Sequence, residues 1–119
     1  MASGLDAVRR FALALPGASE EPHFERTSFR VGGKIFATAD AEGTFLNVFV
    51  EQHEAEAAVA NHPASFTVVF WGNRAKGVTA DLATAPPDRL EELLLEAWRR
   101  WAPKRLVAEL DARLKGRVD

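Results

Sequence analysis

The segment FRVGGKIFATAD, residues 29–40, decides how the rest of the chain is interpreted. Gly-Gly-Lys also occurs where loops hold phosphate, but a P-loop requires Gly-x-x-x-x-Gly-Lys-Ser/Thr at the start of a helix. Here Ile35 follows Lys34, and no glycine stands five residues before Gly33. Two apolar runs joined by two glycines are typical of a tight β-hairpin, because glycine adopts the positive φ of such turns without steric cost. The segment therefore predicts a hairpin rather than a nucleotide-binding loop.

Apolar spacing on both sides of this hairpin predicts the remaining elements. Before it, residues 5–15 are expected to form a helix with Ser3 as its N-cap, followed by a loop with the sequence ASEEPHFER. After it come a third strand over residues 44–50, a helix over residues 51–62 and a second hairpin that turns at Gly72-Asn73. The strongest apolar stripe follows Pro86-Pro87 and predicts a last helix that kinks or restarts at Pro103.

The predicted order of elements is therefore α-βββ-α-ββ-α. Because nearly every strand connection is a short hairpin, the five strands are expected to form a mainly antiparallel sheet with the helices on one face. The fold class is a two-layer α+β domain. A length of 119 residues suits one domain (residues 1–119) with its core at about residues 5–114.

Composition limits the class of protein. Without cysteine the chain has no disulfide framework, thiolate zinc site or cysteine nucleophile, which agrees with the cytoplasmic location that we expect. The first residues lack the basic start and unbroken apolar run of a signal peptide, and no stretch approaches the ~20 apolar residues that span a bilayer. We therefore expect no membrane association.

Charge is unevenly distributed along the chain. The net charge of −2 argues against bulk attraction to nucleic acid. Residues 1–98 hold 8 Lys and Arg against 14 Asp and Glu, a balance of −6, whereas residues 99–119 hold 7 against 3, a balance of +4. We interpret the basic end as a solvated last helix with cations near its C-terminus, with a binding surface as the alternative.

No catalytic or metal-binding signature is recognisable. His23, His53 and His62 do not stand three or four residues apart, so we expect no metal site and no cofactor. The loop from Glu20 to Glu25 is the one local cluster of carboxylates and an imidazole, beside Ser19, Thr27 and Ser28. A general base acting on a hydroxyl is conceivable there, but solvated loop charges are the preferred interpretation. The chain is expected not to be an enzyme.

The hairpin tips carry the residues that we select as a nucleic-acid-binding site. Trp71 ends a strand, and Arg74 and Lys76 follow it; Arg30 and Lys34 flank the first hairpin turn. An aromatic platform beside cations is how proteins hold unpaired bases, and cations hold phosphates. In the alternative interpretation, Trp71 folds over the edge of the core and the cations keep exposed strands from pairing with neighbours.

Two further groups of apolar residues bear on the core and on the second face of the sheet. Trp98 and Trp101 lie in the long helical stripe and are expected in the core. In the strand over residues 44–50 both alternating sets are largely apolar, with Phe45 and Phe49 on one side. That pattern indicates a strand covered on both faces, or one whose second face meets a partner, so a homodimer or protein-interaction adaptor stays open.

Two segments resemble a known family. LALPGASEEPHFERTSFRVGGKIFAT (residues 13–38) is similar to the opening signature of the MmcQ/YjbR-like proteins, and AWRRWAPKRLVAEL (residues 97–110) to the closing helix of one branch, which often has an aromatic-glycine pair like Trp71-Gly72. The resemblance covers about residues 5–114 and implies an α+β fold of the secretion-chaperone-like type. Members are often described as DNA-binding because their hairpins look like the wings of a double-wing transcription factor domain.

Applied to this chain, the resemblance makes the two hairpins the wings, with Lys34 on the first and Trp71, Arg74 and Lys76 on the second. The first hypothesis is therefore a small, non-enzymatic bacterial binding domain that contacts nucleic acid through its hairpins. The second is a homodimeric or protein-interaction adaptor that uses the free sheet face. The third is an enzyme that uses the loop from Glu20 to Glu25.

Overall fold

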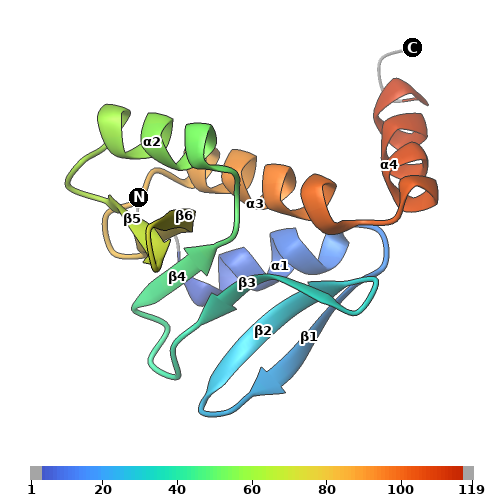
Figure 1. Ribbon diagram of the computed structural model, residues 1–119. Coiled ribbons are helices and arrows are strands. Elements are labelled where there is room, and N and C mark those ends of the chain that lie inside the picture. The colour runs from blue at the N-terminus through green and yellow to red at the C-terminus, as the bar shows by residue number, and fades with distance from the viewer. Residues whose placement is uncertain (1–3, 117–119) are drawn as a thin grey trace.

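The structure, a computed structural model, describes residues 4–116. Helices lie above one face of an antiparallel sheet, and the last helix is set at a steep angle to the one before it (Figure 1). In chain order the elements are α1 (Leu5–Ala14), β1 (Ala18–His23), β2 (Arg26–Val31), β3 (Lys34–Ala39), β4 (Phe45–Val48), α2 (Gln52–Asn61), β5 (Phe66–Trp71), β6 (Arg74–Asp81), α3 (Pro87–Trp101) and α4 (Lys104–Gly116). Within the described chain, no helix is long and apolar enough to cross a bilayer.

The hairpin expected at Gly32-Gly33 is confirmed. Val31 pairs with Lys34 across the turn, and both glycines have positive φ, 58° and 79°. The second expected hairpin is confirmed as well, with Trp71 paired to Arg74. All strand pairs are antiparallel, and the strand order β1-β2-β3-β4-β6-β5 places β4 and β6 side by side, although α2 and β5 separate them in sequence.

The sheet has six strands, so the expectation of five was wrong. The segment ASEEPH, expected to be loop, forms β1 and pairs with β2 from Ala18↔Val31 to His23↔Arg26. It lacks the apolar alternation of a strand and contains Pro22, which only an edge strand tolerates. Side-chain hydrogen bonds hold this edge: the Ser28 hydroxyl donates to the Glu21 carbonyl at 2.8 Å.

The core lies between the sheet and α1, α2 and α3. Facing residues of the central strands are in register and buried: Phe29 beside Ala37, Ala37 beside Val48, and Val48 beside Val78. Trp98 of α3 is fully buried, as expected, and its indole Nε1 donates to the Pro16 carbonyl at 3.0 Å. This hydrogen bond fixes α3 against the turn that leaves α1 and satisfies both buried polar groups.

The other face of the sheet is polar at its centre. Ser28, Thr38, Asn47, Thr79 and Thr67 form one row across five strands. The Asn47 amide donates to Thr38 Oγ1 at 3.2 Å and accepts from Thr79 Oγ1 at 2.7 Å. The alternating side chains Phe45, Asn47 and Phe49 therefore include a polar residue at their centre. This face of the sheet is not the apolar surface that Phe45 and Phe49 suggested.

The expected break at Pro103 is confirmed, because α3 ends at Trp101 and α4 begins at Lys104. The α4 helix returns toward α1 through Leu106, which is buried and lies so close to Gly17 that a β-carbon there would be 2.6 Å from the Leu106 Cδ1 atom. An ion pair from Arg99 to Asp111 at 3.0 Å ties α4 to α3. At the other end of the chain the N-cap of α1 is Gly4, and Ser3 lies outside the described residues.

Candidate ligand-binding cleft

A cleft of about 490 Å³ opens on the polar side of the sheet, between the tips of the β2-β3 and β5-β6 hairpins. It exists because β4 is short. The last residue of β4, Val48, pairs with Ala37 on one side and Val78 on the other, whereas β3 begins at Lys34 and β6 at Arg74. Both hairpins therefore run past the end of β4 with no strand between them, and we call the resulting hollow the cleft.

The chain that leaves β4 forms the floor of the cleft. The Phe49 amide donates to the Phe36 carbonyl at 3.0 Å, and the Phe49 carbonyl accepts from Trp101 Nε1 at 3.2 Å and Arg100 Nη1 at 3.3 Å. Gly77 permits this path, because a β-carbon at that position would lie 2.2 Å from the Val48 carbonyl oxygen and 2.9 Å from Phe49 Cα. The end of α3 is thus fastened to the end of β4, and its last two side chains reach the cleft.

Cations and aromatic rings alternate along the walls of the cleft. The Lys76 ammonium lies 4.2 Å from the centre of the Trp71 ring and 4.7 Å from that of Phe49. On the opposite side, the Trp101 ring has the Arg100 guanidinium at 4.7 Å and the Lys34 ammonium at 5.9 Å. These distances are those of cation–π contacts, which hold the long basic side chains over the rings while leaving their charges near solvent.

The lining is strongly basic although the whole chain is acidic. It contains four cations (Lys34, Arg74, Lys76 and Arg100) and three aromatic rings (Phe49, Trp71 and Trp101), and none of the described residues that line it is Asp or Glu. In the whole chain, by contrast, acidic residues outnumber Lys and Arg, 17 to 15. Trp71 keeps 74% of its surface exposed despite its contact with Lys76. The cleft therefore offers positive potential and an open aromatic face to an anionic ligand that carries a planar ring.

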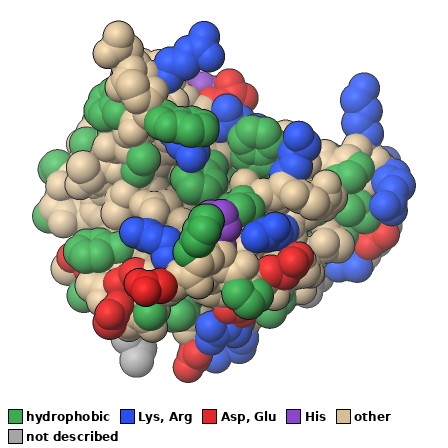
Figure 2. Space-filling model, turned by 60° about the horizontal axis from the view of Figure 1, so that its bottom comes forward, with side chains coloured by type: hydrophobic (Ala, Val, Ile, Leu, Met, Phe, Trp, Pro, Cys, Tyr) green, Lys and Arg blue, Asp and Glu red, His purple; other side chains and the backbone are tan. Residues whose placement is uncertain are grey.

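Figure 2 shows the molecule with its lower side turned forward. Lys and Arg side chains and hydrophobic side chains lie interspersed over the middle of this face, around a histidine, and the acidic side chains gather mainly in the lower half of the view. His23 from β1 and Thr38 from β3 add hydrogen-bonding groups to the lining of the cleft.

The structure brings four of the five residues selected from the sequence to this one cleft, namely Lys34, Trp71, Arg74 and Lys76. The fifth, Arg30, does not line it and instead donates through Nε to the Ser28 hydroxyl at 2.9 Å. The four residues belong to hairpins that are far apart in sequence, and the pairing of β4 with both β3 and β6 places them together.

Of the four cations and three aromatic rings in the cleft, three were missed by sequence reasoning, namely Phe49, Arg100 and Trp101. Trp101, expected in the core with Trp98, is only half-buried and presents its ring to the cleft, so that expectation was wrong in part. Phe49, expected on a free sheet face beside Phe45, forms part of the lining. Arg100 was counted only among the basic residues of the last helix. The signal that could have found Arg100 and Trp101 is their position in the last turn before Pro103.

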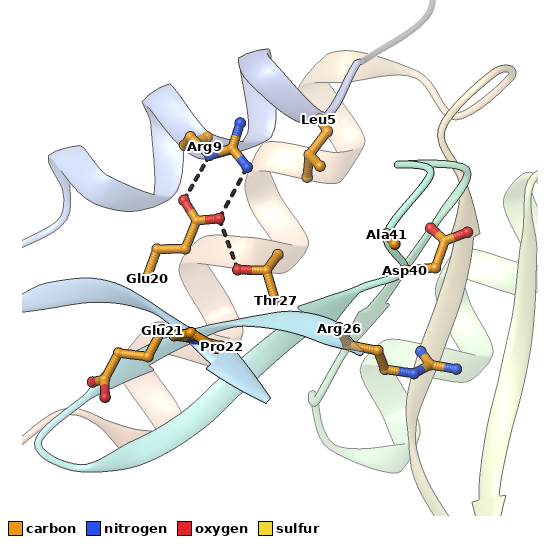
Figure 3. Close-up of a pocket in the computed structure, with 9 residues that line it drawn as sticks. All are labelled: Leu5, Arg9, Glu20, Glu21, Pro22, Arg26, Thr27, Asp40 and Ala41. Carbon is orange, nitrogen blue, oxygen red and sulfur yellow. Dashed lines mark hydrogen bonds and ion pairs between the residues drawn. The ribbon is translucent and has the colours of Figure 1, made fainter. Parts of the chain in front are cut away.

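Of the cluster from Glu20 to Glu25, Glu20 and Glu21 line a separate hollow between α1, β1 and β2, drawn in Figure 3, whereas His23 lines the cleft. Glu20 points at Arg9 of α1, which donates to its carboxylate at 2.6 and 2.9 Å, and Thr27 Oγ1 donates to the same group at 2.7 Å. These hydrogen bonds hold the pKa of Glu20 below its ordinary value, and those from Arg9 have the largest effect. A carboxylate so engaged joins α1 to the edge strand and is poorly suited to accept a proton.

Metal ligands are not assembled in the part of the chain that the structure describes. No group of three or more His, Asp or Glu side chains among residues 4–116 is placed to hold a metal ion. The contact between Arg9 and Glu20 raises the pKa of Arg9 and lowers the pKa of Glu20. Neither group lies in the cleft.

Comparisons with known proteins agree with this architecture. The family model described as YjbR matches residues 13–100, which include all six strands and most of α3. The fold is similar to the crystal structure of the Deinococcus radiodurans protein DR2400, described with the family-model domain DUF419, with a TM-score of 0.71 and 27% sequence identity over 81% of this chain and 76% of that one. A search of curated proteins found no match.

Proposed function

The chain belongs to the YjbR family, and we propose that it is a non-enzymatic domain that binds single-stranded nucleic acid in the cleft between its two hairpin tips. The observation that carries the proposal is the composition of the cleft: four cations and three aromatic rings with no acidic residue in the described lining. Proteins that bind single strands combine these two features, since cations follow the phosphates and bases stack on exposed rings.

The shape of the site favours an unpaired strand over a duplex. The aromatic rings line a hollow and do not form a convex ridge, so a base must leave its stack to reach them. Trp71 offers the most exposed ring, and Lys34 and Arg74 stand exposed at the two hairpin tips, where the phosphates on either side of such a base would lie. Contacts of this kind are tolerant of sequence, because every base has a planar face.

The absence of catalysis is part of the proposal. It is supported by the engagement of Glu20 with Arg9 and Thr27, which removes the carboxylate that the sequence suggested as a general base. A chain without cysteine suits the reducing bacterial cytoplasm, which is the location that we propose.

Fluorescence anisotropy with a labelled 12-nucleotide single strand, and with the corresponding duplex, tests this function. If all four cations contact phosphate, the logarithm of affinity falls with the logarithm of salt concentration with a slope of about −2.8, a loss of roughly 50-fold between 50 and 200 mM salt. Trp71→Ala is expected to weaken binding about 5- to 150-fold without changing that slope, because it removes stacking and no charge.

A matched pair of double variants separates the cleft from general charge. Lys34→Ala with Arg74→Ala is expected to reduce the slope to about −1.4, whereas Arg10→Ala with Arg105→Ala removes the same charge from exposed helical positions and leaves it near −2.8. Equal effects of the two double variants would contradict the proposal. So would a dissociation constant weaker than about 0.1 mM for every single strand at 50 mM salt, because that lies beyond the weak end of the range of non-specific binding.

A further inference from the structure

A second hollow, independent of the cleft, lies on the helical side of the molecule. It has a volume of about 700 Å³ and is lined by residues from α1, α3 and α4. We call it the helical groove, and its apolar lining consists of Phe11, Ala14, Leu15, Leu95, Leu110 and Leu114. Leu114 is 40% exposed, and Phe11 and Leu95 are only partly covered. An apolar surface of this kind, left open on a small domain, is typical of an interaction site.

The helical groove has ends of opposite charge. Phe11 and Leu95 also line a shallower hollow beside it, which is bordered by Asp88, Glu91 and Glu92 at the start of α3. At the other end Arg113 lines the groove from α4, and Lys115 follows in the same basic last turn. The described part of the chain supplies no ion-pair partner for Asp88, Glu91 or Lys115, whereas Glu92 and Arg113 have neighbours within their own helices. The charges at the two ends are therefore available to a second molecule.

From this charge order we propose that the helical groove is the interface of a homodimer, occupied by the same groove of a second copy related by a two-fold axis. A two-fold interface brings one surface against itself. When the two-fold axis runs across the groove, each end of the groove meets the opposite end of its partner. Rotation by 180° then places the acidic end against the basic end at two equivalent places, with the apolar linings in contact between them. A surface that is acidic at one end and basic at the other is complementary to itself in this arrangement.

The interface depends on α4 as well as on α1 and α3. The family match ends at Arg100, before α4 begins, and α4 supplies Leu110, Arg113 and Leu114 to the groove. The groove lies on the helical side of the sheet and the cleft on the other, so a dimer leaves both clefts open. The dimer and the proposed nucleic-acid binding are therefore tested separately.

Two charge-reversed variants test the dimer by sedimentation velocity over about 1 to 500 µM protein. The acidic-end variant is Glu91→Lys with Glu92→Lys, and the basic-end variant is Arg113→Glu with Lys115→Glu. Each variant by itself is expected to dissociate about tenfold more readily than wild type, because like charges then face each other at both ends of the interface.

An equimolar mixture of the two variants provides the decisive measurement. In the mixed dimer the new lysines face the new glutamates at one end, and unchanged acidic and basic ends face each other at the other. The mixture should therefore dimerise about as tightly as wild type. A mixture as weak as its components would overturn the proposal, and so would a wild-type chain that stays monomeric at 500 µM.

A third variant distinguishes a small apolar ligand from a second copy. Leu114→Glu changes an exposed residue, so it should keep the wild-type circular dichroism spectrum and melting temperature and lose the dimer. If the wild-type chain is instead a monomer whose groove binds anilinonaphthalene sulfonate, and Leu114→Glu abolishes that binding, the groove holds a small apolar molecule and the dimer proposal is wrong.

Discussion

Gly77→Ala adds only one carbon atom, but it is expected to be strongly destabilising to the folded protein. The new β-carbon would meet the Val48 carbonyl oxygen at 2.2 Å and Phe49 Cα at 2.9 Å. The first distance is more than about 1 Å inside ordinary contact, and both neighbours are backbone atoms, which cannot rotate away. The end of β4 must therefore move off β6, which disturbs the pairing of Val48 with Val78 and the floor of the cleft.

The size of the effect follows from three contributions. Overpacking costs about 1–3 kcal/mol, the loss of two backbone hydrogen bonds would cost about 2 kcal/mol, and the stiffer unfolded chain returns up to about 1 kcal/mol. The net destabilisation is about 2–4 kcal/mol. An unfolding entropy of about 2.1 cal/mol/K per residue gives about 0.25 kcal/mol/K for the 119 residues, so the melting temperature should fall by about 8–16 °C.

Thermal unfolding followed by circular dichroism measures this difference. Gly116→Ala is the matched control, since a β-carbon there has no neighbour within 4 Å and the backbone has no positive φ. The control should melt within about 2 °C of wild type or slightly above it. A Gly77→Ala variant that also melts within about 2 °C of wild type would refute the close approach of β4 to β6 on which the shape of the cleft depends.

Three other substitutions probe different parts of the fold. Trp98→Phe leaves the Pro16 carbonyl without its donor and should lower the urea-unfolding free energy by about 1–3 kcal/mol, whereas the exposed Trp71→Phe should change it by less than about 0.5 kcal/mol. Phe24 is 94% exposed with a left-handed φ of 60°, so Phe24→Gly should raise the melting temperature by a few degrees; a decrease would show that the ring stabilises the β1-β2 turn. Because the pKa of Glu20 is lower in the folded chain than its ordinary value of 4.5, its contribution is complete above that pH and is lost as the pH falls through the folded pKa. Wild type should therefore lose stability more steeply than Glu20→Gln below about pH 4.5, and parallel pH profiles of melting temperature would contradict this assignment.

The elements predicted correctly are those with strong local signals. The turn at Gly32-Gly33 needs only glycine flanked by apolar strands, and the break at Pro103 needs only the missing amide hydrogen of proline. The β1 strand had no such signal. Its residues become a strand because Glu20 is held by Arg9 and Thr27 and because β2 offers an edge, and both conditions arise from contacts outside the segment.

The candidate site was likewise predicted only in part from the sequence. Lys34, Trp71, Arg74 and Lys76 were selected because cations and an aromatic ring at hairpin tips are recognisable in the sequence. Their convergence in one cleft depends on the pairing of β4 with β6 across the intervening α2 and β5, which no local pattern reveals. The contributions of Phe49 and of the last turn of α3 depend on the same long-range arrangement.

Local chemistry was thus sufficient for the hairpins, the helical stripes and the α+β class, because turn geometry and side-chain periodicity act over a few residues. The place where β4 stops between two longer hairpins, and the meeting of α4 with α1 and α3, arose from packing between distant segments. Those two features create the cleft and the helical groove, so the surfaces to which we assign function are the part of this protein that short-range rules cannot specify.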